Sequence, residues 1–254
     1  MALIQCNFFS EALQCSTSMT VILPQTTTHI GVESKSFEQQ KHPTLYLLHG
    51  LSDDHTIWTR FTSIERYVAP LGLAVVMPSA GRSFYTDMEN GYDYYTYVSE
   101  ELPQIARSFF QLSDKREDNY VAGLSMGGYG ALKVAMRNPE KFAAGASLSG
   151  SVDIVDRISA FPRDFQHIFG DRPIKDSDDD LFYLAEKLAK SEGPKPRLYQ
   201  CCGTEDHNYN ANIRFRDHLA KLSLDSTFEE GPGAHEWGYW DQHIQPVLKF
   251  LHQR

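Results

Sequence analysis

The sequence has few basic residues and no cluster of them. Lys and Arg together number 24 among 254 residues, against 33 Asp and Glu, and the formal net charge is −9. Nucleic acids and anionic membrane surfaces select for patches rich in Lys and Arg. We therefore expect no nucleic-acid partner and no membrane partner, and the composition favours a small molecule that is uncharged or weakly charged.

Long apolar runs are missing as well. No stretch approaches the ~20 apolar residues that a membrane-spanning helix needs. The first basic residue is Lys35, so the beginning of the chain has none of the charged residues of a secretory signal peptide. The sequence thus predicts a cytoplasmic location.

Cysteine is scarce, and its spacing is uninformative about metals or redox motifs. The four cysteines, Cys6, Cys15, Cys201 and Cys202, show no Cys-x-x-Cys spacing. Cys201 and Cys202 are neighbours in a predicted strand, where successive side chains point to opposite faces. We expect reduced thiols, most of them buried.

Motifs that bind cofactors are absent too, among them the phosphate loop, the dinucleotide fingerprint and the zinc-protease helix. The run Asp176-Ser-Asp-Asp-Asp180 concentrates carboxylates, but runs of like charge usually remain in water. We interpret it as a solvated loop and helix N-terminus. The sequence therefore predicts no cofactor and no metal.

The chain does contain an alternation of strand-like and helix-like patterns. With 41% hydrophobic residues, it can bury a full core and fits one domain, residues 1–254. The predicted strands cover residues 3–9, 19–23, 45–48, 73–77, 120–122, 145–148, 197–202 and 226–229. The predicted helices cover residues 56–69, 94–110, 126–137, 210–222 and 241–252. Such alternation specifies an α/β fold with a mostly parallel central sheet flanked by helices on both faces.

Two parts of the chain depart from this alternation. The first two strands predict an antiparallel hairpin at a sheet edge, followed by a polar, exposed loop over residues 26–40. Residues 151–196 fit poorly, apart from a short helix at 181–190. We interpret this second segment as a small lid-like insertion beside the edge formed by the carboxyl ends of the strands.

Residues 119–130 contain the pattern Gly123-x-Ser125-x-Gly127. A strand-like end precedes the serine, and a helical pattern follows it until Pro139. In this context the serine occupies a strained turn, where side chains at the two glycines would collide with neighbouring backbone. The pattern predicts the nucleophile elbow of an α/β-hydrolase, with Ser125 as the catalytic nucleophile.

A serine nucleophile needs a histidine base, and the histidine needs a carboxylate that fixes its tautomer. In α/β-hydrolases the acid follows a late strand and the histidine follows the last one. Asp206 comes after strand 197–202, and His235 lies in the glycine-rich loop after strand 226–229. We expect both to join Ser125 in a catalytic triad, with the adjacent Glu205 as a competitor for the role of the acid.

The segment that ends the first parallel strand predicts an oxyanion hole. His49 and Gly50 form a glycine turn there, which leaves backbone N–H groups free to face a substrate oxygen. We assign the donors to the main-chain amides of Leu51 and Met126, the residue after the nucleophile.

Aromatic residues are frequent in the segments around these loops, and core packing accounts for about half of them. We expect three of them, Trp58, Tyr85 and Trp237, to bind substrate together with Gly50.

Several of these segments also carry a family resemblance. They are Leu47-Leu-His-Gly-Leu51 with Trp58, Ser83-Phe-Tyr-Thr-Asp-Met88, Gly123-Leu-Ser-Met-Gly-Gly128, Gly203-Thr-Glu-Asp206 and Gly233-Ala-His-Glu-Trp237. They closely resemble the esterase D group of α/β-hydrolases, which includes S-formylglutathione hydrolases, feruloyl and acetyl esterases, and bacterial tributyrin esterases. The start of the chain resembles the small tributyrin esterases most.

The resemblance implies a carboxylesterase of short acyl esters with Ser125, Asp206 and His235 as its triad. One position departs from the family pattern, because the histidine loop often reads Gly-Gly-His and here has Ala234. Alanine does not adopt positive φ freely, so we expect a slightly different setting of this loop.

The leading hypothesis is therefore a serine carboxylesterase that acts on a small ester through an acyl-enzyme. A thioesterase of the S-formylglutathione type uses the same chemistry with a different leaving group. An acyltransferase would need a site that admits an acceptor alcohol and excludes water. A non-catalytic binding module predicts a broken triad, whereas all three members are present. Association into a homo-oligomer is a further expectation, because related esterases often associate.

Overall fold

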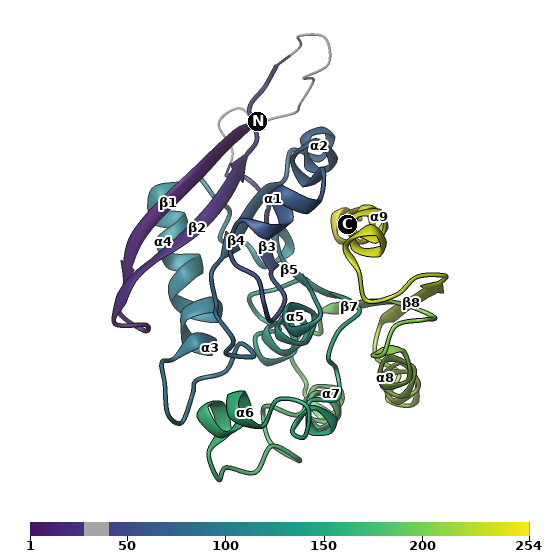
Figure 1. The fold of residues 1–254 in the computed structure, drawn as a ribbon. Coiled ribbons are helices and arrows are strands. Elements are labelled where there is room, and N and C mark those ends of the chain that lie inside the picture. The colour runs from purple at the N-terminus through teal and green to yellow at the C-terminus, as the bar shows by residue number, and fades with distance from the viewer. Residues whose placement is uncertain (28–40, 254) are drawn as a thin grey trace.

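The computed structural model describes residues 1–27 and 41–253 and is built around an eight-stranded sheet (Figure 1). The strands lie side by side in the order β1-β2-β4-β3-β5-β6-β7-β8. In chain order they are β1 (Ala2–Ser10), β2 (Cys15–Leu23), β3 (Thr44–Leu48), β4 (Ala74–Pro78), β5 (Asn119–Leu124), β6 (Ala144–Leu148), β7 (Arg197–Gly203) and β8 (Ser226–Gly231). Each predicted strand is present and is longer than predicted or shifted by one residue.

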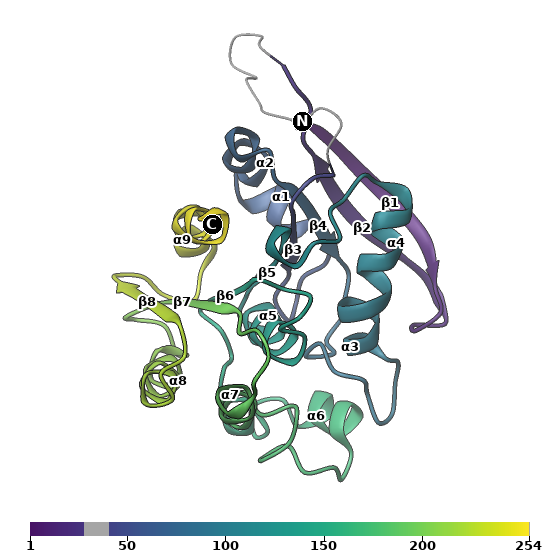
Figure 2. The same cartoon turned by 180° about the vertical axis from the view of Figure 1, so that it is seen from behind.

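The sheet is mixed at one edge and parallel elsewhere. β2 pairs antiparallel with both β1 and β4, while β4, β3, β5, β6, β7 and β8 pair parallel in that order. The predicted hairpin at the sheet edge is thus confirmed, and Figures 1 and 2 show it at the opposite end of the sheet from β8. The carboxyl ends of the parallel strands share one edge, where ligands of such sheets bind.

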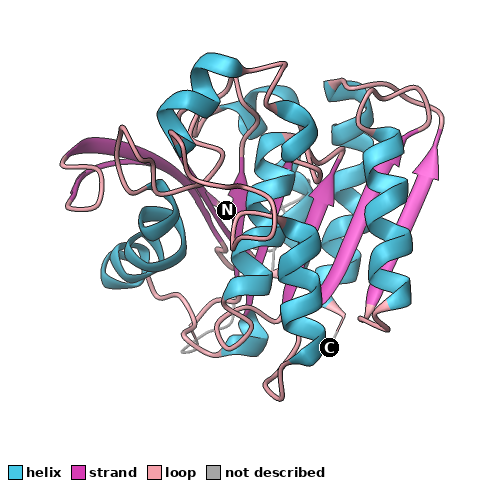
Figure 3. Cartoon of the chain, turned by 90° about the horizontal axis from the view of Figure 1, so that it is seen from below, coloured by secondary structure: helices cyan, strands magenta, loops and turns pink. Residues whose placement is uncertain are grey.

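Helices cover both faces of the sheet (Figure 3). They are α1 (Ile57–Phe61), α2 (Ile64–Val68), α3 (Tyr94–Thr96), α4 (Leu102–Phe109), α5 (Met126–Arg137), α6 (Pro162–Phe169), α7 (Leu181–Lys190), α8 (Tyr209–Lys221) and α9 (Trp237–His252). α1, α2 and α9 pack on one face, and the helices from α3 to α8 pack on the other. The mostly parallel α/β architecture is therefore as predicted.

The alternation of side chains along β5 shows why both faces must be covered. Tyr120, Ala122 and Leu124 pack toward α9, whereas Val121 packs toward α5. All residues of this strand are buried, as expected for a central strand of a parallel sheet.

Three predicted helices have different limits in the structure. The helix predicted over residues 56–69 is broken between α1 and α2, because Thr62 is extended and Ser63 N donates to Asp241 Oδ1 of α9 at 3.1 Å. α9 in turn begins four residues earlier than predicted, at Trp237. The run predicted over residues 94–110 is interrupted by a π-helical segment at Tyr97–Glu101 between α3 and α4.

The insertion over residues 151–196 packs beside the sheet and contains α6 and α7. The helix predicted at 181–190 is confirmed, and its Asp180 caps α7 by accepting a hydrogen bond from Phe182 N at 2.9 Å. The description of the acidic run as solvated is wrong for Asp179, whose carboxylate contacts the buried ammonium of Lys133 at 2.5 Å.

Three further expectations can be compared with the structure. Cys201 and Cys202 are buried free thiols, while Cys15 is exposed and Cys6 half-buried, so burial is less general than predicted. The loop predicted over residues 26–40 lies almost wholly outside the described residues. In the part of the chain that the structure describes, no helix has the length and apolar character to cross a membrane.

Candidate active site

Ser125 lies between β5 and α5 with backbone angles φ 53° and ψ −117°, a conformation that costs a non-glycine residue free energy. Its N–H donates to Leu148 O at 2.9 Å, which fixes the turn to the neighbouring strand. A Cβ at Gly123 would lie 2.4 Å from the carbonyl oxygen of Gly127, and one at Gly127 would lie 2.5 Å from the carbonyl oxygen of Leu48. Only glycine fits at both positions, so the local sequence forms the predicted turn.

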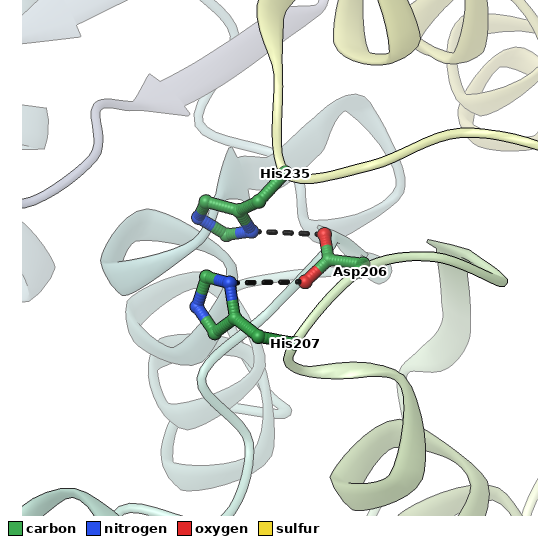
Figure 4. A group of neighbouring side chains, drawn as sticks. All are labelled: Asp206, His207 and His235. Carbon is green, nitrogen blue, oxygen red and sulfur yellow. Dashed lines mark hydrogen bonds and ion pairs between the residues drawn. The ribbon is translucent and has the colours of Figure 1, made fainter.

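The structure brings Ser125, His235 and Asp206 together from three separate loops. His235 Nε2 lies 2.9 Å from Ser125 Oγ, and His235 Nδ1 lies 2.8 Å from Asp206 Oδ2 (Figure 4 shows the second contact). This chain of hydrogen bonds can transfer a proton from the serine to the histidine while the carboxylate holds the ring.

The two adjacent carboxylates have different surroundings. The side chain of Asp206 is fully buried and accepts a hydrogen bond from Asn208 N at 2.7 Å besides its contact with His235. Burial acts to raise the pKa of Asp206, but the hydrogen bonds from His235 and Asn208 outweigh it and the pKa is lowered. Glu205 is exposed, and its Oε2 accepts from Gly233 N at 2.6 Å. Glu205 therefore stabilises the histidine loop through the main chain of Gly233, and Asp206 is the carboxylate that is hydrogen-bonded to His235.

The histidine loop is held against the end of β7. Gly233 has φ 147°, and its carbonyl oxygen would lie 2.0 Å from a Cβ at Gly203. The positive φ falls on Gly233 and not on Ala234. The alanine that departs from the family pattern is therefore compatible with the loop, since it needs no left-handed conformation.

A cavity of about 530 Å³ opens in front of Ser125 and His235. Its lining residues come from the segments after β3, β4, β5, β6, β7 and β8, from the insertion and from the start of α9: Gly50, Leu51, Ser52, Asp53, Phe84, Leu124, Ser125, Met126, Ser151, Arg157, Phe161, His207, His235, Glu236, Trp237 and Trp240. A larger hollow of about 640 Å³ lies at α2 and the start of β1, away from this chemistry. The nucleophile and the histidine identify the first cavity as the candidate active site.

The predicted oxyanion donors, Leu51 and Met126, both line this cavity beside Ser125. Met126 is the first residue of α5, where N–H groups have no acceptor within the helix. Leu51 follows the turn at His49, whose ring is buried: Nε2 accepts from Ala80 N at 2.8 Å, so Nδ1 donates to Gly50 O at 2.6 Å. Burial lowers the pKa of His49 to about 4, which keeps this ring neutral and the turn in place.

Two of the predicted pocket aromatics do not line the cavity, and this corrects the prediction. Trp58 is buried, and its Nε1 donates to Leu48 O at 3.1 Å. Tyr85 is buried as well, and its hydroxyl donates to His49 O at 2.9 Å. Both hold main-chain carbonyls of the segment that leads to Leu51, so they support the wall of the site from behind it. The other two predicted residues, Gly50 and Trp237, do line the cavity.

Several polar residues at the cavity were not predicted, and two of them, His207 and Arg157, can carry a positive charge. His207 stands beside the triad, its ring centroid 4.4 Å from that of His235 and its Nδ1 3.8 Å from Asp206 Oδ1. Arg157 comes from the insertion. His207 could have been found from its position next to the acid, whereas nothing in the sequence around Arg157 points to the site.

Asp206, His207 and His235 also place potential ligand atoms within 4.8 Å of one another (Figure 4). The carboxylate of Asp206 and the ring nitrogens of His235 are already hydrogen-bonded to each other, to Ser125 and to Asn208. A cation here would have to break the contact between His235 and Asp206. The donor set therefore fits proton transfer better than a resident metal.

Comparison with known proteins agrees with the geometry. The model of the Esterase family, described as "Putative esterase", matches residues 10–251. The chain belongs to the Esterase family. It is 31% identical to an acetyl esterase of Caldicellulosiruptor saccharolyticus over 267 aligned positions, which cover 99% of this chain and 98% of the relative.

Solved structures of the family have the same fold. The substrate-bound fluorophosphonate-binding serine hydrolase F of Staphylococcus aureus is 36% identical with a TM-score of 0.91, covering 100% of this chain and 99% of the other. An S-formylglutathione hydrolase of the same organism is 35% identical with a TM-score of 0.87, covering 99% of each chain. The Esterase-family protein is thus a carboxylic ester hydrolase with the α/β-hydrolase fold, as predicted.

Proposed function

We propose that the protein is a serine carboxylesterase that hydrolyses short acyl esters through Ser125, His235 and Asp206. The observation that carries this proposal is the unbroken hydrogen-bond chain from Ser125 Oγ through His235 to Asp206. The serine end of this chain faces a cavity. A serine hydroxyl is a poor nucleophile unless a base of this kind accepts its proton.

The reaction proceeds in two halves. His235 Nε2 accepts the proton of Ser125 as Oγ attacks the ester carbonyl, and the amides of Leu51 and Met126 stabilise the oxyanion. His235 then protonates the leaving alcohol, and the acyl group stays on Ser125. A water molecule, deprotonated by His235, then attacks the acyl carbon. The bond to Ser125 Oγ breaks, His235 returns the proton to that oxygen, and the acid leaves. Throughout, the lowered pKa of Asp206 keeps it ionised beside the imidazolium.

The walls of the cavity support a preference for short acyl groups. Trp237 and Trp240 stand edge to face on one side, 5.1 Å between centroids, and Phe84 and Phe161 lie 6.2 Å apart on another. Bulky rings of this kind limit the length of chain that can enter, and the acetyl esterase among the relatives supports the same class of substrate.

A thioesterase is the second candidate, and a specific finding favours it. A solved S-formylglutathione hydrolase covers nearly the whole chain at 35% identity. Thioester hydrolysis uses the same nucleophile, base and oxyanion donors, so only the contacts to the leaving group distinguish the two activities.

The test compares hydrolysis of p-nitrophenyl esters from acetyl to dodecanoyl with that of S-formylglutathione, in the wild type and in Ser125→Ala. We expect the substitution to remove nearly all activity, since loss of a triad member costs about a million-fold in kcat. Labelling with a fluorophosphonate, followed by peptide mass spectrometry, should place the adduct on Ser125. A folded Ser125→Ala variant with full activity would refute the proposal.

A further inference from the structure

One part of the cavity, lined by Arg157 and His207, has no role in the hydrolytic mechanism, and we call it the cationic corner. Arg157 is half-buried in the insertion and lines the cavity together with His207. Within residues 1–27 and 41–253, Arg157 forms main-chain hydrogen bonds, but no hydrogen bond or ion pair is found for its guanidinium group. A partly buried cation without a partner is costly, so this group is suited to receive an anion from outside the protein.

The acidic neighbours of Arg157 are already occupied. Asp153 and Asp156, on the same segment, both accept from Arg214 Nη2 of α8, at 2.7 Å and 2.6 Å. The carboxylates that line the cavity itself, Asp53 and Glu236, belong to the loop after β3 and the N-cap of α9, and no ion pair joins either of them to Arg157. These carboxylates therefore leave the charge of Arg157 available to a ligand.

His207 supplies a second group at the same corner. Burial and the neighbouring ring of His235 lower the pKa of His207, while Asp206 opposes that shift and Arg157 adds to it. The ring is therefore neutral at pH 7, when it can donate one hydrogen bond without adding a second charge. Its side chain is 58% exposed, so it is accessible to a bound molecule.

The position of His207 indicates which half of the substrate meets this corner. The leaving oxygen or sulfur must come to His235 Nε2, because that atom returns the proton to it. His207 stands 4.4 Å from His235, ring to ring, and Arg157 interacts electrostatically with His207. The corner therefore lies on the leaving-group side of the scissile bond.

We propose that Arg157, assisted by His207, binds a carboxylate carried by the alcohol or thiol half of the substrate. This inference rests on the proposed function and makes it narrower: the preferred substrates are short acyl esters or thioesters of an acidic alcohol or thiol. The guanidinium can donate two parallel hydrogen bonds to the carboxylate oxygens, and His207 adds a neutral donor.

The experiment measures kcat/KM for two substrates with the same acetyl group, 4-acetoxybenzoate and the neutral 4-acetoxybenzamide. The readout is the ratio of the first to the second. We expect Arg157→Gln to lower this ratio about ten- to hundred-fold, the worth of one charge-assisted hydrogen bond, and Arg157→Lys to restore part of it. The matched control is Arg163→Gln, an exposed arginine of the same insertion outside the cavity, which should leave the ratio unchanged.

Other outcomes decide against the assignment. An unchanged ratio in Arg157→Gln, with both esters hydrolysed, would overturn it. The assignment would also be overturned if Arg157→Gln lowered kcat/KM for phenyl hydrogen succinate more than for phenyl butyrate, because the succinate ester carries its charge in the acyl half. If the wild type hydrolyses none of these esters, the proposed function fails instead.

A second measurement uses only the wild type and does not depend on whether a variant folds. Hydrolysis of phenyl acetate is inhibited with 4-hydroxybenzoate or with 4-hydroxybenzamide. The proposal requires the carboxylate to inhibit at the lower concentration, and equal inhibition by the two would refute it.

Discussion

The ammonium group of Lys133, in the helix that follows the nucleophile, lies 2.5 Å from a carboxylate oxygen of Asp179 in the insertion. The side chain of Lys133 is fully buried and also donates to Tyr85 O at 3.1 Å and to Thr86 Oγ1 at 2.8 Å. Burial lowers the pKa of Lys133, and Asp179 opposes that shift. One buried cation thus joins α5, the insertion and the turn that carries Phe84 into the cavity.

Asp179→Asn should therefore destabilise the protein strongly. Removing one partner of a buried pair leaves an uncompensated charge and costs about 3–5 kcal/mol. Urea unfolding measures the loss of free energy of unfolding. Asp178→Asn is the matched control, because Asp178 pairs with Lys187 at the surface, where the side chains are 42% and 60% exposed. Equal unfolding midpoints for the two variants would contradict the role of the buried pair.

The second prediction separates the two adjacent carboxylates. Asp206→Asn should lower kcat by roughly ten-thousand-fold, because the amide favours the wrong tautomer of His235. Glu205→Gln removes the charge that accepts from Gly233 N but leaves the contact between Asp206 and His235 intact. We expect its kcat to fall far less. A larger loss in Glu205→Gln than in Asp206→Asn would show that the acid is assigned to the wrong residue.

These two residues also show the limit of what the sequence predicts. The elbow at Ser125 is predictable because its glycines, strand and helix are contiguous in the sequence. The preference for Asp206 over Glu205 depends on how the turn after β7 packs against the loop that carries His235, so in the sequence Glu205 remains a competitor.

The pocket residues are predicted less well for the same reason. Trp58 and Tyr85 are near the site in sequence order, but their rings turn inward to satisfy carbonyls of the segment after β3. Arg157 reaches the cavity only because the insertion folds back over the sheet edge. The single domain and the homo-oligomer stay predictions.

The third prediction concerns pH. His49 is neutral and buried in the folded state with a pKa of about 4, whereas a histidine in the unfolded chain titrates near ~6.5. Between these values the unfolded state binds a proton that the folded state does not, so the free energy of unfolding falls as pH falls. The loss from this residue should reach about 2 kcal/mol by pH 5.

Urea unfolding of the wild type and His49→Gln at pH 7.5 and pH 5 measures this effect. The variant should be less stable at pH 7.5, because Ala80 N–H and Gly50 O lose their partners. Its stability should nevertheless depend less on pH than that of the wild type. Other histidines contribute equally to both proteins, so parallel pH dependences would rule out the assigned role of His49.

The last prediction concerns the length of the acyl group and the wall formed by Trp237. This ring lines the cavity, packs against Trp58 at 5.4 Å and is stacked with Phe61 at 5.2 Å on its outer side. Each methylene that fits adds about 0.8 kcal/mol of transfer free energy until the chain meets the wall. We expect the highest kcat/KM of the wild type between acetyl and hexanoyl esters.

Trp237→Leu removes most of this wall and should move the maximum toward longer esters, while hydrolysis of acetyl esters falls only modestly. Phe61→Leu is the control, since Phe61 contacts Trp237 from outside and is 50% exposed. It should leave the chain-length profile unchanged. If both variants keep the profile of the wild type, the acyl group lies elsewhere in the cavity, and a wild-type maximum at dodecanoyl or longer esters would contradict the short-acyl preference itself.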